Sequence, residues 1–264
     1  MNFGRLIHKL GPVVGLALAA SLAGCDHANI SINGDEGKPL TQLDLTGAPP
    51  EKLTLLGPDT VRVTPGDKLA ISVEGDAKTA EKLRFSLKDG ELGIMRDGES
   101  RGWSSHGDPV IVNVTMPAPH ALTMAGSGRI DAAALASTAE VTVAGSGEIS
   151  VASHTGDSLD LTIAGSGNYR SAGQIKRLDL SIAGSGSANM EGLRVDAADL
   201  SIAGSGDAVF ASDGEVDASI MGSGSVTVRG RARCKVSSMG SGRLICESGT
   251  VDCDAPAGSA TSKL

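Results

Sequence analysis

Apolar and polar residues alternate around seven copies of Gly-Ser-Gly in the second half of the chain. The residues four and two positions before each triplet are almost all apolar, and so are those four and six positions after its first glycine. Side chains two residues apart lie on the same side of a β-strand, so each triplet is predicted to be a corner between two strands. The copies begin at Gly126, Gly145, Gly165, Gly184, Gly204, Gly222 and Gly240.

The triplets recur every 18 to 20 residues, which is the period of a repeat architecture. We therefore expect an all-β fold, a β-solenoid with about 18–20 residues per coil, stacked by parallel pairing about 4.8 Å apart. Leu135, Ile175 and Val195 are expected to close a third, less regular side of each coil. A helical period of 3.6 would not place apolar residues at intervals of two.

The first half follows the same apolar phase less regularly. Leu53 and Leu55 precede Gly57-Pro58-Asp59, which predicts a corner, and Ile71 and Val73 precede Gly75 as in a further coil. We expect a short helical turn within residues 76–82, a hairpin around residues 88–91 and a strand over residues 110–116.

These segments together resemble a known family. The stretch 53–76, then Lys88-Asp89-Gly90-Glu91-Leu92 and the Ala-Gly-Ser-Gly repeats are similar to the putative auto-transporter adhesin, head GIN domain family, over about residues 43–255. The resemblance implies a right-handed parallel β-helix in a bacterial envelope protein without an established enzymatic activity. It brings no functional residues to carry over.

The first residues form a secretory signal. A short basic stretch precedes an apolar run too short to span a bilayer, and Leu22-Ala23-Gly24-Cys25 resembles the bacterial lipoprotein box. The resemblance implies cleavage before Cys25 and acylation of its thiol, so we expect the membrane to be reached through lipid on Cys25. Under the enteric-type sorting rule for lipoproteins, Asp26 implies retention at the inner membrane. That rule is not universal among bacteria, so which membrane and which side stay open.

Five segments follow from these patterns. We expect a lipoprotein signal peptide at 1–24, a tether at 25–42, irregular N-terminal β coils and a hairpin at 43–120, the regular solenoid at 121–257 and a tail at 258–264. Pro256 and Asp254 in the last coil have the character of a cap that disfavours strand addition, so a monomeric ectodomain is expected.

Composition narrows the functional classes. Removing residues 1–24 leaves 21 basic and 31 acidic side chains, a net charge of −10, which argues against a nucleic-acid partner. Aromatic residues are nearly absent, with only Phe85, Trp103, Tyr169 and Phe210 outside the signal, whereas glycan-binding platforms are usually aromatic.

Carboxylates recur five residues before five of the corners. Their stacking would be destabilising, and two interpretations stay open: a solvated face that blocks unwanted sheet pairing, or a face that binds cations such as calcium. The residues are Glu140, Asp160, Asp179, Asp199 and Asp217, with a hydroxyl column and a small-residue column beside them. No other cofactor is expected.

Three cysteines remain beyond Cys25. Cys234 and Cys253 are 19 residues apart, about one coil, which favours a disulfide between them; three small core residues are the alternative. The histidines outside the signal, His27, His106, His120 and His154, lack metal spacing and are expected in exposed loops.

No catalytic residues are assigned. Gly98-Glu99-Ser100-Arg101-Gly102 matches a nucleophile-elbow pattern only formally, since it lies in a polar loop, and Trp103 beside it is expected either to cap the first coils or to contact a partner.

The sequence thus predicts a non-catalytic, lipid-anchored envelope protein with a role in adhesion or envelope organisation, whose partner is an envelope or cell-surface polymer. The alternatives are a polysaccharide-binding or polysaccharide-cleaving β-helix and a self-assembling or cation-binding structural protein.

Overall fold

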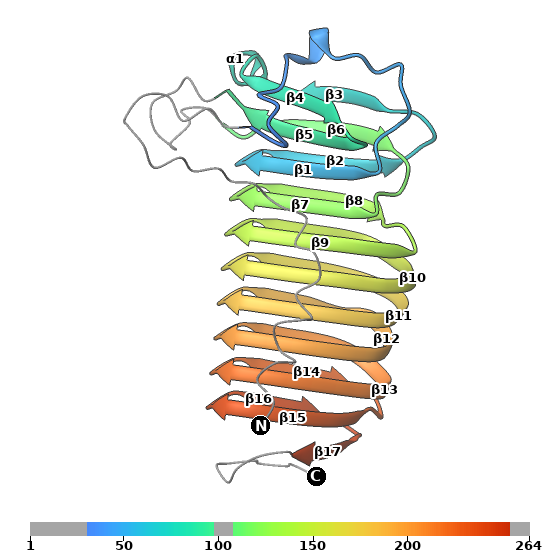
Figure 1. The fold of residues 1–264 in the computed structure, drawn as a ribbon, viewed down its shortest axis with the longest axis vertical. Helices are drawn as coiled ribbons and strands as arrows, with labels where there is room; N and C mark the ends of the chain where they lie inside the picture. The colour runs from blue at the N-terminus through green and yellow to red at the C-terminus, as the bar shows by residue number, and fades with distance from the viewer. Residues whose placement is uncertain (1–30, 98–107, 254–264) are drawn as a thin grey trace.

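The protein is an elongated rod of stacked β-coils (Figure 1). The computed structural model describes residues 31–97 and 108–253, and these form a β-solenoid of about seven turns. All the strands of the described residues join one sheet, with parallel pairing throughout the regular coils. The predicted all-β solenoid is therefore confirmed.

The N-terminal part contains short elements. They are the 3-10 helix η2 (Leu40–Gln42), strands β1 (Lys52–Gly57), β2 (Thr60–Pro65) and β3 (Ala70–Glu74), helix α1 (Ala77–Ala80), and strands β4 (Leu83–Lys88), β5 (Glu91–Arg96) and β6 (Ile111–Met116).

The regular part contains eleven strands among the described residues, of which β10 to β13 are the longest. They are β7 (Ala121–Gly126), β8 (Arg129–Ala134), β9 (Thr138–Gly145), β10 (Glu148–Gly165), β11 (Asn168–Gly184), β12 (Ser187–Gly204), β13 (Asp207–Gly222), β14 (Ser225–Arg229), β15 (Arg233–Gly240), β16 (Arg243–Cys246) and β17 (Thr250–Cys253).

Strands β10 to β13 each run from one Gly-Ser-Gly corner to the next. Between the corners the only interruptions are register shifts, for example between Val151 and His154 and between Arg170 and Ala172. Each coil is thus a flattened loop with one sharp glycine corner and one gentler, bulged bend, since a bulge lets a strand curve without ending.

The interior is a narrow apolar core built from the alternating residues. The two inward columns before the corners are almost fully buried from Leu122 and Met124 down to Ile220. Leu135, Ile175 and Val195, expected to close the coils, are buried as well. Tyr169 and Phe210 are the two aromatic residues of the regular coils, and both are buried. The other buried side chains there are mostly aliphatic, so the core depends mainly on aliphatic packing.

Close backbone contact explains the glycines. Gly184 has φ +124, and a Cβ on it would lie 2.3 Å from the carbonyl oxygen of Gly165 on the coil above. The backbone N–H of Ser185 donates to that same carbonyl at 2.8 Å, and the pattern recurs at every corner from Gly145 to Gly240. The corner therefore excludes any side chain at its first position, because the ladder continues through it.

The N-terminal end is closed by a cap in which strand order departs from chain order. Strand β1 lies between β5 and β7, and β2 lies between β6 and β8, so the first coil is inserted between later ones. Strands β4 and β5 form the predicted hairpin, with Asp89 and Gly90 at positive φ. Strand β3 was expected to belong to a further parallel coil, but it pairs antiparallel with β6.

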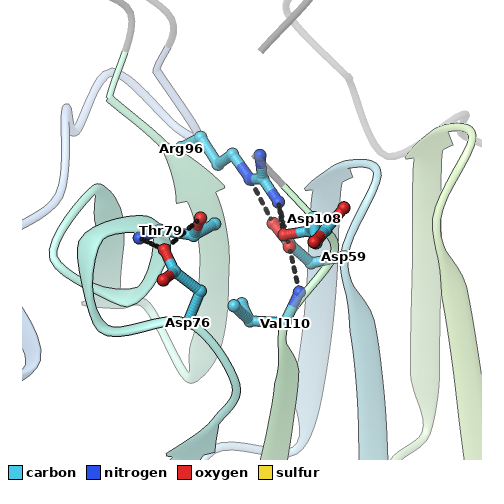
Figure 2. A network of polar contacts seen from close by, with 6 residues as sticks. All are labelled: Asp59, Asp76, Thr79, Arg96, Asp108 and Val110. Atoms are coloured by element: carbon cyan, nitrogen blue, oxygen red, sulfur yellow. Dashed lines mark hydrogen bonds and ion pairs between the residues drawn. The ribbon is translucent and has the colours of Figure 1, made fainter. Parts of the chain in front are cut away.

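A buried ion pair fixes the corner of the inserted coil (Figure 2). Asp59 takes the place of the second corner glycine and is 1% exposed. Its carboxylate accepts from the Arg96 Nε at 2.8 Å and from the backbone N–H of Val110 at 3.0 Å, and Arg96 also donates to the carbonyl of Asp108. One side chain thus joins the corner to the end of β5 and the start of β6.

The cap also contains the expected helical turn. Helix α1 begins after Asp76, whose carboxylate accepts from the backbone N–H of Thr79 at 2.9 Å (Figure 2). This is an N-cap that satisfies an otherwise free donor of the helix.

Residues 31–45 lie against the cap, although residues up to 42 were expected to be a tether. Lys38 exchanges two backbone hydrogen bonds of 2.8 Å with Phe85 of β4, and Ile32 is buried over Gly93 of β5. Leu40 and Leu43 pack on the core. The apolar residues of this segment cover the open end of the solenoid, which a polar tether would leave exposed.

The C-terminal end is held by a disulfide, but not the expected one. Cys234 is joined to Cys246, with 6.8 Å between their Cα atoms, so the predicted pairing of Cys234 with Cys253 is wrong. The last turn has 17 residues, which sets Val251 beside Cys234 and Cys253 beside Val236. The disulfide therefore crosses one coil, where the core residues Val236 and Leu244 are only half-buried.

Replacing a corner glycine should destabilise the rod. We expect Gly184→Ala to lower the free energy of unfolding by about 2 kcal/mol or more, since the new Cβ meets a backbone oxygen at positive φ. The neighbouring Ser185→Ala, at an exposed position, is the control and should change it by less than about 0.5 kcal/mol. Urea unfolding followed by circular dichroism measures both, and equal effects would contradict the close-contact account.

Breaking the disulfide should loosen only the last coil. For Cys246→Ser, hydrogen exchange should show β16 and β17 opening at a cost about 3 kcal/mol lower, with β9 to β13 still protected. Cys253→Ser is the control and should leave exchange unchanged. Loss of protection along the whole rod would show that the end is not an independent unit.

Candidate interaction surface

One wall of the rod presents parallel columns of like residues, which we call the ladder face. It consists of the outward side chains one, three and five residues before each corner, on β7, β9 to β13 and β15. The expected acidic column is confirmed by the register, in which each residue pairs with the next: Glu140, Asp160, Asp179, Asp199 and Asp217. Ala121 and Lys235 continue it at its two ends.

An arginine relieves the repulsion in the middle of this column. The Arg177 Nε lies 2.8 Å from the Asp179 carboxylate, and its Nη2 also contacts Asp199 on the next coil. The pKa of Arg177 is raised by its hydrogen bond and charge interaction with Asp179. The three side chains are partly exposed, so this bridge is worth at most about 1 kcal/mol.

The upper end of the column is less well compensated. Among the described residues, neither Glu140 nor Asp160 forms an ion pair. The pKa of Glu140 is raised by desolvation and by the charge of Asp160, and the pKa of Asp160 is raised by desolvation and by the charge of Asp179. The unfavourable electrostatic and desolvation free energy of the stacked column is therefore concentrated at these two carboxylates.

The remaining columns of the ladder face are uncharged. Thr54 continues the hydroxyl column upward but is buried, and Ile32 of the N-terminal segment lies over Gly93, its neighbour on β5. The alanine column gives way to Met221 and Met239, which are 52% and 72% exposed. The hydroxyl column consists of Thr123, Thr142, Thr162, Ser181, Ser201, Ser219 and Ser237.

The corners add a ridge of exposed serines beside this face. The central serine of every triplet is exposed, while the second glycine is buried in all but the last copy. The ridge consists of Ser127, Ser146, Ser166, Ser185, Ser205, Ser223 and Ser241. The outcome is a long surface of hydroxyl and methyl groups repeated at the strand spacing.

The columns do not assemble a metal centre. Within residues 31–97 and 108–253, no group of three or more His, Cys, Asp or Glu side chains is arranged to hold a metal ion. The structure thus brings the five candidate carboxylates into one column without giving them the convergent oxygens that calcium requires.

His154 departs from the expectation of an exposed loop histidine. It is fully buried at the bend of β10, where its Nε2 donates to the carbonyl of Ala136 at 3.0 Å and its Nδ1 has no partner among the described residues. Burial lowers its pKa. His120 is partly exposed, 3.3 Å from Glu51. The polar residues around His154 gave no sign that the bend would enclose its ring.

Several predicted features lie outside the described residues. These are Cys25 with its signal, His27, His106, the Gly98–Gly102 motif and Trp103. In the part that the structure describes, none of the helices is long and apolar enough to cross a bilayer.

Neutralising Asp160 should stabilise the protein at neutral pH. The folded state raises the pKa of this carboxylate, so its cost is present above the folded pKa and disappears below the ordinary value of 3.8. We expect Asp160→Asn to raise Tm by about 1–3 °C at pH 7, which corresponds to a gain on the order of 0.5 kcal/mol in the free energy of unfolding. Near pH 3.5 the substitution should leave Tm unchanged.

Asp199→Asn is the matched control in the same column. It removes the contact with Arg177, so it should not raise Tm at pH 7. Differential scanning calorimetry at both pH values checks the pair, and a gain for both variants would show that Arg177 does not compensate the column.

Acidification should destabilise the fold through His154. Its folded pKa lies below the ordinary 6.5, so the unfolded chain binds the proton first and stability falls as pH drops below about 6.5. One such proton changes the free energy of unfolding by at most about 1.4 kcal/mol per pH unit. Urea unfolding between pH 7.5 and 5 should show a shallower fall for His154→Gln than for the parent, and parallel curves would refute the assignment.

Comparison with solved structures finds this fold in bacterial proteins. A putative adhesin from Bacteroides fragilis is 20% identical, with TM-score 0.65, over 75% of this chain and 92% of its own. A putative lipid binding protein from Parabacteroides distasonis is 21% identical, with TM-score 0.59, over 75% and 93%. A putative adhesin from Parabacteroides merdae is 17% identical, with TM-score 0.56, over 80% and 94%.

At these identities the solved structures establish the fold alone. None of the proteins with curated descriptions matches the chain. The family model described as "putative auto-transporter adhesin, head GIN domain" matches residues 49–232, which are most of the cap and of the regular coils. The chain therefore belongs to the putative auto-transporter adhesin, head GIN domain family.

Proposed function

We propose that this protein is a non-catalytic, lipid-anchored component of the bacterial envelope that uses its ladder face for adhesion or envelope organisation. The observation that carries the proposal is the ladder face itself, with an uncharged hydroxyl column held in register over seven coils and an alanine column held over five of them. A surface that repeats at one spacing suits a partner that is itself repetitive, such as an envelope or cell-surface polymer.

Family membership supports an adhesin-like role. Two of the solved structures with this fold, from Bacteroides fragilis and Parabacteroides merdae, are described as putative adhesins. Lipid attachment at Cys25 is supported by the Leu-Ala-Gly-Cys sequence directly after an apolar run. The acidic column makes an anionic polysaccharide an unfavourable partner, because the charges of the two would repel.

The protein does not need to self-associate in order to bind the proposed polymer. We propose a monomeric ectodomain, since the cap covers the N-terminal end, and since Asp254 and Pro256, which follow the described residues, have the charge and the ring that disfavour strand addition at the other end. Sedimentation of the soluble ectodomain should give one species of monomer mass at all concentrations.

A complementation experiment tests the role in adhesion. Cells lacking the protein should attach less to a surface or lose envelope integrity, and the parent sequence should restore both. Cys25→Ser should fail to restore them because the protein is no longer anchored. Thr162→Arg with Ser201→Arg places two large charges on the uncharged part of the ladder face and should also fail.

The matched control carries the same charges on the opposite wall. Ser150→Arg with Asn189→Arg lies outside the ladder face, on the outward positions of β10 and β12, and should restore attachment. Unchanged attachment and integrity in cells without the protein would argue against the proposed role, and equal behaviour of the two arginine pairs would argue against the ladder face.

A further inference from the structure

We infer that the capped N-terminal end of the rod is its membrane-proximal end and that the C-terminal coil points away from the membrane. The inference rests on the proposed lipid attachment at Cys25 and adds to it the surface that faces the bilayer. It follows from the length of chain available between the lipid and the first residue fixed on the cap.

That length is short because the structure begins to pack immediately. Ile32 is buried over Gly93, and Asn33 donates to the Glu91 carboxylate at 2.7 Å. Ile32 and Asp35 also exchange backbone hydrogen bonds of 3.0 and 2.9 Å. Residues 31–42, expected to belong to the tether, are thus part of the folded rod.

Only residues 26–30 remain as a connection. A chain from Cys25 to Ser31 spans at most about 22 Å even when fully extended. The acyl chains on Cys25 are therefore confined to the neighbourhood of the cap, whatever conformation the connecting residues adopt.

The opposite end lies beyond this reach. Nine successive strand pairings lead along the ladder wall from β5, under Ile32, to β17. At about 4.8 Å a step, they place the C-terminal coil about 43 Å from β5. Figure 1 shows the cap and β17 at opposite ends of the long axis.

Charge opposes a rod that lies flat on the bilayer. Residues 108–253 carry 16 acidic and 10 basic side chains, a net charge of −6, so anionic headgroups repel this part of the rod within a Debye length of about 8–10 Å. Among the basic residues of the last coil, Arg229, Arg231 and Arg233 form ion pairs with acids of earlier coils. In this orientation the exposed Met221 and Met239 lie in the part of the rod away from the membrane.

Energy transfer from a labelled rod to the membrane tests the orientation. The acylated protein with Cys253→Ser is reconstituted into vesicles of phosphatidylglycerol and phosphatidylethanolamine that contain a headgroup acceptor dye. One version is labelled at the cap through Lys78→Cys and the other at the far end through Arg243→Cys; both positions are exposed. The Cys234–Cys246 disulfide keeps the other two thiols unreactive.

We expect transfer from the cap label to be several-fold more efficient than from the far label, in low and in high salt. Equal transfer from an acylated protein would overturn the upright orientation while leaving the anchor intact. Mass spectrometry of the same preparation reports acylation, and an unmodified Cys25 would overturn both the anchor and this inference. With Cys25→Ser, neither label should transfer energy to the vesicles.

Discussion

Continuous backbone pairing through the corners is the constraint on which the rest of this structure depends. From the corner at Gly145 onward, the N–H of the corner serine donates to the carbonyl of the first corner glycine on the coil above. Two backbones can come this close only if no Cβ stands between them. The glycines thus hold every coil in the same register, and that register lines up every outward column.

The columns of like side chains are a consequence of this register, and the charged column lowers the stability of the fold. Like side chains must stack, so one column of carboxylates forms on the ladder face, and the desolvation of Glu140 and Asp160 shows in their raised pKa values. Arg177 relieves the repulsion where it can reach two coils. Alternating charges along this column would be more stable than five stacked carboxylates. The stacked carboxylates instead keep the surface solvated and disfavour pairing with other sheets.

The end coils have a neighbouring coil on one side only, and the two ends of the rod are stabilised in different ways. At the N-terminal end, antiparallel strands and an apolar segment cover the open core, and the Asp59–Arg96 pair ties the inserted coil to its neighbours. Its location inside the cap allows one carboxylate to satisfy three donors, which offsets the cost of burying it. At the C-terminal end the core residues are only half-buried, and a disulfide supplies the constraint that packing does not.

The regular coils could be predicted from the sequence because everything that defines them is local. The alternation of apolar residues sets which side chains point inward, and the Gly-Ser-Gly period sets where the chain turns, so the solenoid, its acidic column and the hairpin at Asp89-Gly90 all follow from residues close together in the chain. The cap, the disulfide and His154 depended on the tertiary structure. Distant segments compete for the same strand edge or the same buried volume, and the outcome decides the position of β1 beside β5 and the antiparallel direction of β3. It also decides which cysteine faces Cys234 and whether a bend encloses the imidazole of His154. A pattern of neighbouring residues cannot predict this outcome, because it contains no information about the distant segments.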